Sequence, residues 1–196
     1  MNIHHAGAKN SDDPFKTPTG SECSRKPSGQ YLLKIWGRFP PDWLGNISSG
    51  ISKNRISIIS GSAEKVDNVW QAEFVMEKTP AAPDPNKIDY QALVLEAPDR
   101  ATSTAISLDS YFLDEEPGNN DGALYLEVKA HDQLGFLGAL INRFAFYALF
   151  PETVIIETVN GMIFDRFWIK GVGGCLPSPM VVDTLRRKLE AFCADG

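Results

Sequence analysis

The segment DQLGFL at residues 132–137 repeats the pattern of DWLGNI at residues 42–47. Asp, Leu and Gly coincide at an offset of 132 − 42 = 90 residues, and each copy ends on an aliphatic residue. Each copy follows an apolar run typical of a strand and begins a run with helical spacing. A match at the same place in two parallel patterns predicts two copies of one small module.

The elements around the second copy follow regular patterns. Residues 123–130 (ALYLEVKA) alternate between apolar and polar side chains, which is typical of a half-buried strand. From Leu137 onward the apolar residues recur at helical spacing, which predicts a helix packed on a sheet. The Asn160-Gly161 pair predicts a tight hairpin between two further strands, and a last helix is expected from Pro179.

The same order of elements is expected around the first copy. Residues 31–36 form a strand-like run, and helical spacing follows Asp42, a suitable N-cap. A hairpin is predicted over residues 55–77, with its turn at Asp67-Asn68. A short helix over residues 86–97 completes this half.

These patterns predict an α+β protein of two tandem modules, at residues 31–98 and 104–196. Residues 1–30 are rich in Ser, Pro, Gly, Asn and charge, so we predict a disordered tail there. Residues 104–114 precede the strand at 123–130 through a turn-rich loop, and we expect the two to pair as a hairpin.

That pairing would give the second module a permuted edge strand. The first module would then lack its own fourth strand and leave the strand at residues 31–36 with a bare edge. Because bare edges invite pairing with other strands, we expect either a dimer through that edge or one sheet shared between the modules.

Composition excludes several classes of protein. The net charge of −6 comes from acidic and basic residues spread along the chain, which argues against a nucleic-acid partner. The sequence has no run of about 18 apolar residues, so no membrane partner is expected. Cys23, Cys175 and Cys193 form no CxxC pair, which disfavours disulfides and zinc, and a cytoplasmic location is expected. His4 and His5 are interpreted as incidental residues of the tail.

Two stretches carry a likeness to a known family. Residues 131–145 (HDQLGFLGALINRFA) resemble the first turn and helix of the ACT domain. Residues 157–171 resemble its return strand, with the pattern falling on Gly161, Asp165, Phe167 and Ile169. The likeness covers residues 123–192 well and residues 31–97 weakly. The two stretches are similar to the C-terminal ACT pair of bacterial glutamine-sensing uridylyltransferases.

The resemblance implies a ferredoxin-like βαββαβ fold for each module, and a regulatory module that binds an amino acid or a related small metabolite. The second module departs from the family because no final strand follows its last helix. The implied ligand contacts are the residues of the first turn of each module, namely Asp132, Gln133, Leu134, Gly135 and Phe136, and Asp42, Leu44 and Gly45. Phe39, Pro40 and Pro41 precede the first-module turn and are expected to distort its pocket.

The turn also has a simpler interpretation. Asp at such a turn caps the helix and Gly permits a close backbone approach, so the motif alone favours a capped turn without a ligand. His131 beside Asp132 suggests an acid–base pair, but neighbouring residues on a strand point apart and no nucleophile lies near. Cys175 lies in a Gly-rich stretch that is interpreted as a flexible loop. We therefore predict that the protein is not an enzyme and needs no cofactor or metal.

Two functions remain open. The first is the ligand-binding regulatory module, with a homo-oligomer and a partner enzyme as expected partners. The second is a protein-interaction or oligomerisation domain without a small-molecule ligand. Seven aromatic residues between 144 and 168 exceed what one helix–sheet face needs, so some are expected either at an interface or in a larger core.

Overall fold

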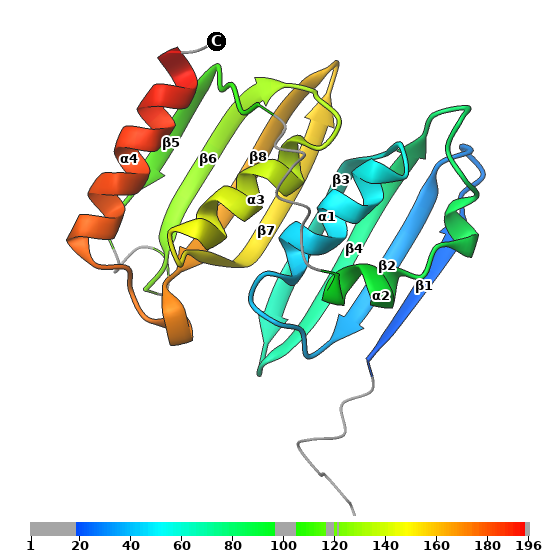
Figure 1. The fold of residues 1–196 in the computed structure, drawn as a ribbon, viewed down its shortest axis with the longest axis horizontal. Helices are drawn as coiled ribbons and strands as arrows, with labels where there is room; N and C mark the ends of the chain where they lie inside the picture. Colours follow the sequence, from blue (N-terminus) through cyan, green and yellow to red (C-terminus); the bar gives the residue numbers. More distant parts are fainter. Residues whose placement is uncertain (1–18, 97–104, 117–119, 121, 195–196) are drawn as a thin grey trace, which may run out of the picture.

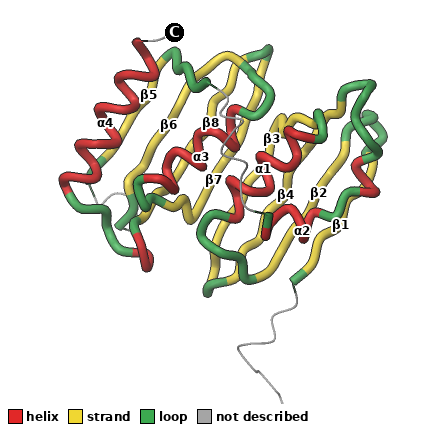
Figure 2. Tube along the Cα trace, viewed as in Figure 1, coloured by secondary structure: helices red, strands yellow, loops and turns green. Residues whose placement is uncertain are grey.

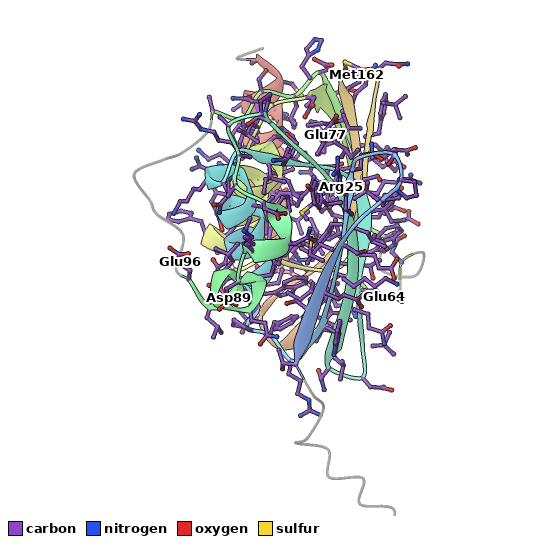
Figure 3. All side chains as sticks on the ribbon, turned by 90° about the vertical axis from the view of Figure 1, so that its right-hand side faces the viewer. Arg25, Glu64, Glu77, Asp89, Glu96 and Met162 are labelled. Carbon is purple, nitrogen blue, oxygen red and sulfur yellow. The ribbon has the colours of Figure 1, made fainter. Side chains whose placement is uncertain are left out.

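The computed structural model describes residues 19–96, 105–116, 120 and 122–194. The eight strands of these segments form one antiparallel sheet in the order β1-β2-β4-β3-β7-β8-β6-β5. The helices lie on one face of the sheet and leave the other face open (Figure 1 and, turned to the side, Figure 3). The prediction of two tandem ferredoxin-like βαββαβ modules is therefore wrong.

Each half of the chain has the order strand, strand, helix, strand, strand, helix (Figure 2). The first half contains β1 (Gly20–Arg25), β2 (Tyr31–Gly37), α1 (Trp43–Lys53), β3 (Ile56–Val66), β4 (Val69–Lys78), the 3-10 turn η1 (Pro85–Lys87) and α2 (Tyr90–Leu95). The second half contains β5 (Ser110–Asp114), β6 (Leu124–His131), α3 (Phe136–Phe146), β7 (Phe150–Val159), β8 (Met162–Lys170), the 3-10 turn η3 (Val172–Gly174) and α4 (Pro179–Ala194).

The central elements of the two halves, β2 to β4 and β6 to β8, are related by an offset of 93 residues, not 90. The edge strands differ, because Gly20 pairs with Trp36 and Ser110 with Lys129, so β1 and β5 are offset by 110 − 20 = 90 residues. Helices α1 and α3 both have 11 residues and begin at positions 43 and 136, so 136 − 43 = 93. Tyr31 pairs with Met76 between β2 and β4, and Leu124 pairs with Ile169 between β6 and β8. Both partners of the second pair lie 93 residues after those of the first. The predicted repeat is therefore present, but α1 aligns with α3 at an offset of 93 residues rather than the predicted 90.

The fourth strand of each half precedes the other three. Strand β5 pairs antiparallel with β6, as predicted. Strand β1 pairs in the same way with β2, so the prediction that residues 20–25 belong to a disordered tail is wrong. Residues 1–18 of the predicted tail lie outside the described residues, and residues 26–30 form the turn between β1 and β2. Because β1 covers the edge of β2, that edge is not bare, and the shared sheet is instead joined through β3 and β7.

Helices α1 and α3 pack against each other at the centre of the molecule (Figure 1). Two equivalent glycines permit the contact. A Cβ atom on Gly138 would lie 2.7 Å from Ser49 Oγ and 2.9 Å from Ser49 N. A Cβ atom on Gly45 would lie 2.3 Å from Asn142 Oδ1. Asn142 Nδ2 donates a hydrogen bond of 3.1 Å to Ser49 Oγ, so the two equivalent polar residues meet between the helices.

Both central helices end in the same way. Ala148 follows α3 with φ 56°, and Arg55 follows α1 with φ 59°. The amides of Ala148 and Leu149 donate to the carbonyls of Ala145 and Phe144, which is the Schellman pattern of helix termination. Glycine is the residue that adopts this left-handed conformation without steric cost.

We expect Ala148→Gly to raise the free energy of unfolding by about 0.5 kcal/mol. The left-handed conformation costs an L-residue about 1–2 kcal/mol, and the greater freedom of glycine in the unfolded chain offsets part of the gain. Urea denaturation followed by circular dichroism measures the change. Ala145→Gly, inside α3, is the matched control and should instead lose about 1 kcal/mol. A similar loss in both variants would contradict the left-handed cap.

No helix in the described part of the chain is long and apolar enough to cross a membrane.

Candidate functional site

A narrow cleft lies on the helix side of the sheet, where the two halves meet. We call it the junction cleft. It is lined by the end of α1, the start of β3, the turn before α3 with the first residues of that helix, and the middle of β7 and β8. Its volume is about 30 Å³, which is room for one or two water-sized groups.

The predicted turn residues of the second half come together at this cleft. Asp132, Gln133, Leu134, Gly135 and Phe136 all line it. The first three are exposed, and Phe136 is buried. Gly135 is the N-cap residue of α3 with φ 87°, a conformation that favours glycine.

The predicted residues of the first half lie elsewhere. Asp42 occupies the N-cap position of α1, but its side chain makes no capping hydrogen bond. Leu44 is buried in the core. Gly45 packs against Asn142 of α3 rather than facing a ligand. These three residues are therefore not among those that line the junction cleft.

Asp165 of β8 is the most unusual residue at the cleft. Its side chain is on the inner face of the sheet, and the residue is only 1% exposed. Burial raises the pKa of this carboxyl to about 7, against a smaller opposite effect of the hydrogen bond from the backbone of Glu157 and with a further increase from Asp132. The group therefore takes up a proton close to neutral pH.

The pairing of β7 with β8 is interrupted beside Asp165. Pairing between β7 and β8 passes from Ile155 with Arg166 to Thr158 with Ile163, without the regular pairs between them. In this interval the amide of Glu157 donates to Asp165 Oδ1 at 3.2 Å. The Asp165 side chain thus accepts a hydrogen bond from a backbone amide that would bond to the neighbouring strand in a regular antiparallel ladder.

Asp165 and its neighbour Arg166 serve different surfaces. Arg166 Nη2 lies 3.3 Å from Glu157 Oε2 on the open face of the sheet. That ion pair is partly exposed, whereas Asp165 is buried on the helix side. Arg166 is therefore not a counter-ion inside the cleft.

Ser48 of α1 adds a second buried polar group. The residue is 4% exposed, and its Oγ has no hydrogen-bond partner among the described residues. Two carboxyl groups, from Asp132 and Asp165, line the same cleft, and its described lining includes no Lys, Arg or His. Such a lining favours a cation or a hydrogen-bond donor.

The equivalent place in the first half is apolar. Subtracting 93 from Asp165 and Asp132 gives Ala72 and Phe39. There, the Phe39 and Trp43 rings lie 5.0 Å apart, and the Trp43 and Trp70 rings lie 5.1 Å apart. The same architecture therefore forms without a buried carboxyl. Because burying a carboxyl without a charged partner is costly, its presence in one half points to a function rather than to folding.

The open face of the sheet carries two further hollows at equivalent positions. One, of about 430 Å³, is lined by Glu127, Lys129, Phe164 and Arg166, among others. The other, of about 540 Å³, is lined by the residues 93 positions earlier, Lys34, Trp36, Gln71 and Glu73, and by others. None of the four positions keeps its residue type, and the charges of the first and last are reversed. The two hollows have therefore diverged.

Sequence reasoning located the turn but left Asp165 and Ser48 out of the predicted site. Asp165 stands in the inward-facing series of β8, between Ile163 and Phe167, and an acid in that series was the available signal. Ser48 gave no signal, because serine in a helix is common. His131 and Cys175 are both exposed, and neither is among the residues that line the cleft.

Comparison with known proteins identifies no relative of this chain. The ACT-like motifs at residues 131–145 and 157–171 remain a sequence resemblance, without the fold that they implied. No protein-family model matches the chain, no curated protein matches it, and no solved structure matches it.

Proposed function

We propose that the protein is a non-catalytic binding module for a small molecule of amino-acid type, and that the ammonium group of this ligand enters the junction cleft. The observation that carries the proposal is Asp165, a buried carboxyl with an apolar counterpart in the repeated half. A carboxyl in this setting gains most from a cationic hydrogen-bond donor.

The size of the cleft limits which part of the ligand is buried. Ligand pockets that enclose a whole small molecule have volumes of roughly 300–1,000 Å³. The junction cleft, at about 30 Å³, accepts a group as small as an ammonium. The rest of the ligand would lie outside, over the exposed side chains of Gln133 and Leu134.

The chemistry of the lining suits both ends of an amino acid. An ammonium group has three donors, and Asp165, Asp132 and Ser48 supply acceptors. The first turn of α3 also lines the cleft, at Leu137 and Gly138. Helix N-termini attract carboxylates, so the carboxylate of the ligand would lie towards this turn.

The test is a thermal-shift screen of the full chain against the twenty amino acids and ethylammonium, followed by titration calorimetry. A ligand that binds the native state must raise the melting temperature. We expect Asp165→Asn to lose this shift, whereas Asp183→Asn, on the exposed surface of α4, should keep it. Binding that survives unchanged in Asp165→Asn would contradict the site. If no probe raises the melting temperature, the proposed function is contradicted, and the alternative of a protein-interaction or oligomerisation domain is favoured.

A second variant tests the turn itself. Gly135→Val should abolish binding and also lower stability by roughly 1–2 kcal/mol, because φ is 87° at this position. Gly135→Asn is the matched variant, since asparagine tolerates the left-handed region better than other residues. It should keep the fold and weaken binding only through its added side chain. Unchanged ligand affinity in both variants would remove the ligand from this turn.

A further inference from the structure

We propose that the ammonium group of the ligand displaces a proton from Asp165, so that binding in the junction cleft releases a proton to solvent. This inference rests on the proposed function and concerns the regulation of the same site. The O–H bond of the carboxylic acid breaks, its proton passes to the buffer, and the carboxylate that remains pairs with the ammonium group. Charge and atoms balance, and no further reactant is needed.

The surroundings of Asp165 make the empty site favour the neutral acid. Helix α1 contributes Ser48 and Ser52, and β3 contributes only Ile56, Ser57 and Ile58 to the cleft. None of these side chains is charged. An ionised Asp165 would therefore be a buried charge without a cation, which is costly in a protein interior.

The remaining elements that line the cleft do not supply a counter-ion. Lys129 of β6 and Arg166 line the hollow on the open face together with Asp165, and neither is among the residues that line the cleft. Strand β7 faces Asp165 with Ile156 and Thr158. Its Glu157 offers a backbone amide, while the Glu157 side chain pairs with Arg166 on the open face. The turn before α3 contributes Asp132, another acid. Asp132 and Asp165 are thus the two titratable groups among the described lining residues of the cleft.

A bound ammonium group reverses this balance. A positive charge at hydrogen-bond distance favours the ionised carboxyl and lowers its pKa. Ser48 Oγ, which has no partner among the described residues, gains a donor at the same time. Proton and ligand therefore compete for Asp165.

The competition predicts how affinity depends on pH. Below the pKa of Asp165, which burial raises to about 7, each lost unit of pH should weaken binding about tenfold, because one proton must leave for each ligand bound. Above about pH 8 the carboxyl is already ionised, and affinity should become independent of pH until the ligand itself loses its proton.

Nuclear magnetic resonance of the full chain tests the inference with glycine and ethylammonium as probes. The backbone amides of Leu134 and Gly135 report binding, and the carboxyl carbon of Asp165 reports its own titration. We expect saturating probe to shift both amides and to lower the midpoint of the Asp165 titration by more than one pH unit. In Asp165→Asn, residual binding should lose its dependence on pH, whereas Asp132→Asn should keep it.

The possible results separate the two proposals. Amide shifts together with a lowered Asp165 midpoint support proton displacement. Amide shifts with an unchanged Asp165 midpoint overturn proton displacement and leave the binding function standing. If neither probe moves the amides at any pH, the proposed function itself is wrong and the inference falls with it.

Discussion

Gly138→Val should lower the free energy of unfolding by about 3 kcal/mol or more. A Cβ at this position would lie 2.9 Å from the backbone nitrogen and 3.2 Å from the Cα of Ser49. Backbone atoms inside a helix cannot move aside as a flexible side chain does. Added volume in a well-packed core costs about 1–3 kcal/mol, and valine adds two methyl groups beyond the Cβ.

Urea denaturation measures this loss, and Gly50→Ala is its control. Like Gly138, Gly50 is buried, but it lies in α1. A Cβ at Gly50 would meet the end of the Leu93 side chain, at 2.7 Å from Cδ2. That side chain can rotate, and alanine favours a helix over glycine by about 1 kcal/mol. We expect Gly50→Ala to lose little stability. Equal unfolding midpoints for wild type and Gly138→Val would show that α1 and α3 are not in close contact.

Asp165→Asn should make the protein more stable at about pH 8 and change little at about pH 4. Because burial raises the pKa of Asp165 to about 7, the folded state holds this proton more tightly than the unfolded state. The contribution of Asp165 to the free energy of unfolding is fully present below the pKa of this carboxyl in the unfolded chain, about 4. That contribution is lost as pH rises towards the pKa in the folded protein. Asparagine stays neutral and is free of that loss, which amounts to about 1.4 kcal/mol for each unit of pKa shift.

Urea denaturation of both proteins across this range measures the effect. The amide oxygen of asparagine can still accept the hydrogen bond from Glu157, so the local sheet geometry is kept. Asp183→Asn is a suitable control, since its carboxyl is exposed and paired with Arg186. If the stability of wild type relative to Asp165→Asn stayed constant from about pH 4 to about pH 8, Asp165 would not be a buried acid.

The local parts of the fold were predictable because their signals are local. The turns at Asp67-Asn68 and Asn160-Gly161 both have positive φ values, as their residue types indicate. The pairing of β5 with β6 followed from a short turn-rich loop between two strand-like runs. Strand β1 gave no such signal, because GSECSR has neither an apolar alternation nor β-branched residues.

The error in the repeat has a definite cause. Residues 134–138 (LGFLG) contain Leu-Gly twice, so Gly45 can be aligned with Gly135 or with Gly138. Sequence letters alone favoured Gly135, because Asp132 then matched Asp42. Packing selects Gly138, since Gly45 and Gly138 are the glycines that permit the contact between α1 and α3.

The junction cleft was only half predictable for a related reason. Residues 132–136 belong to one turn, and one turn can be identified from its own sequence. Ser48 and Asp165 reach the cleft from other elements, and Ser48 comes from the other half of the chain. Their proximity depends on the pairing of β3 with β7, which nothing in either strand specifies.

The seam between β3 and β7 has a consequence for synthesis of the chain. Among the described strands it is the one pairing that joins the halves, and all other pairs form within a half. Domains fold from the N-terminus as the ribosome releases them, so the first half can assemble before the second exists. During that interval β3 would be an uncovered edge of 11 residues, open to pairing with a neighbouring nascent chain. We therefore expect the risk of aggregation during synthesis to be greatest before β7 emerges.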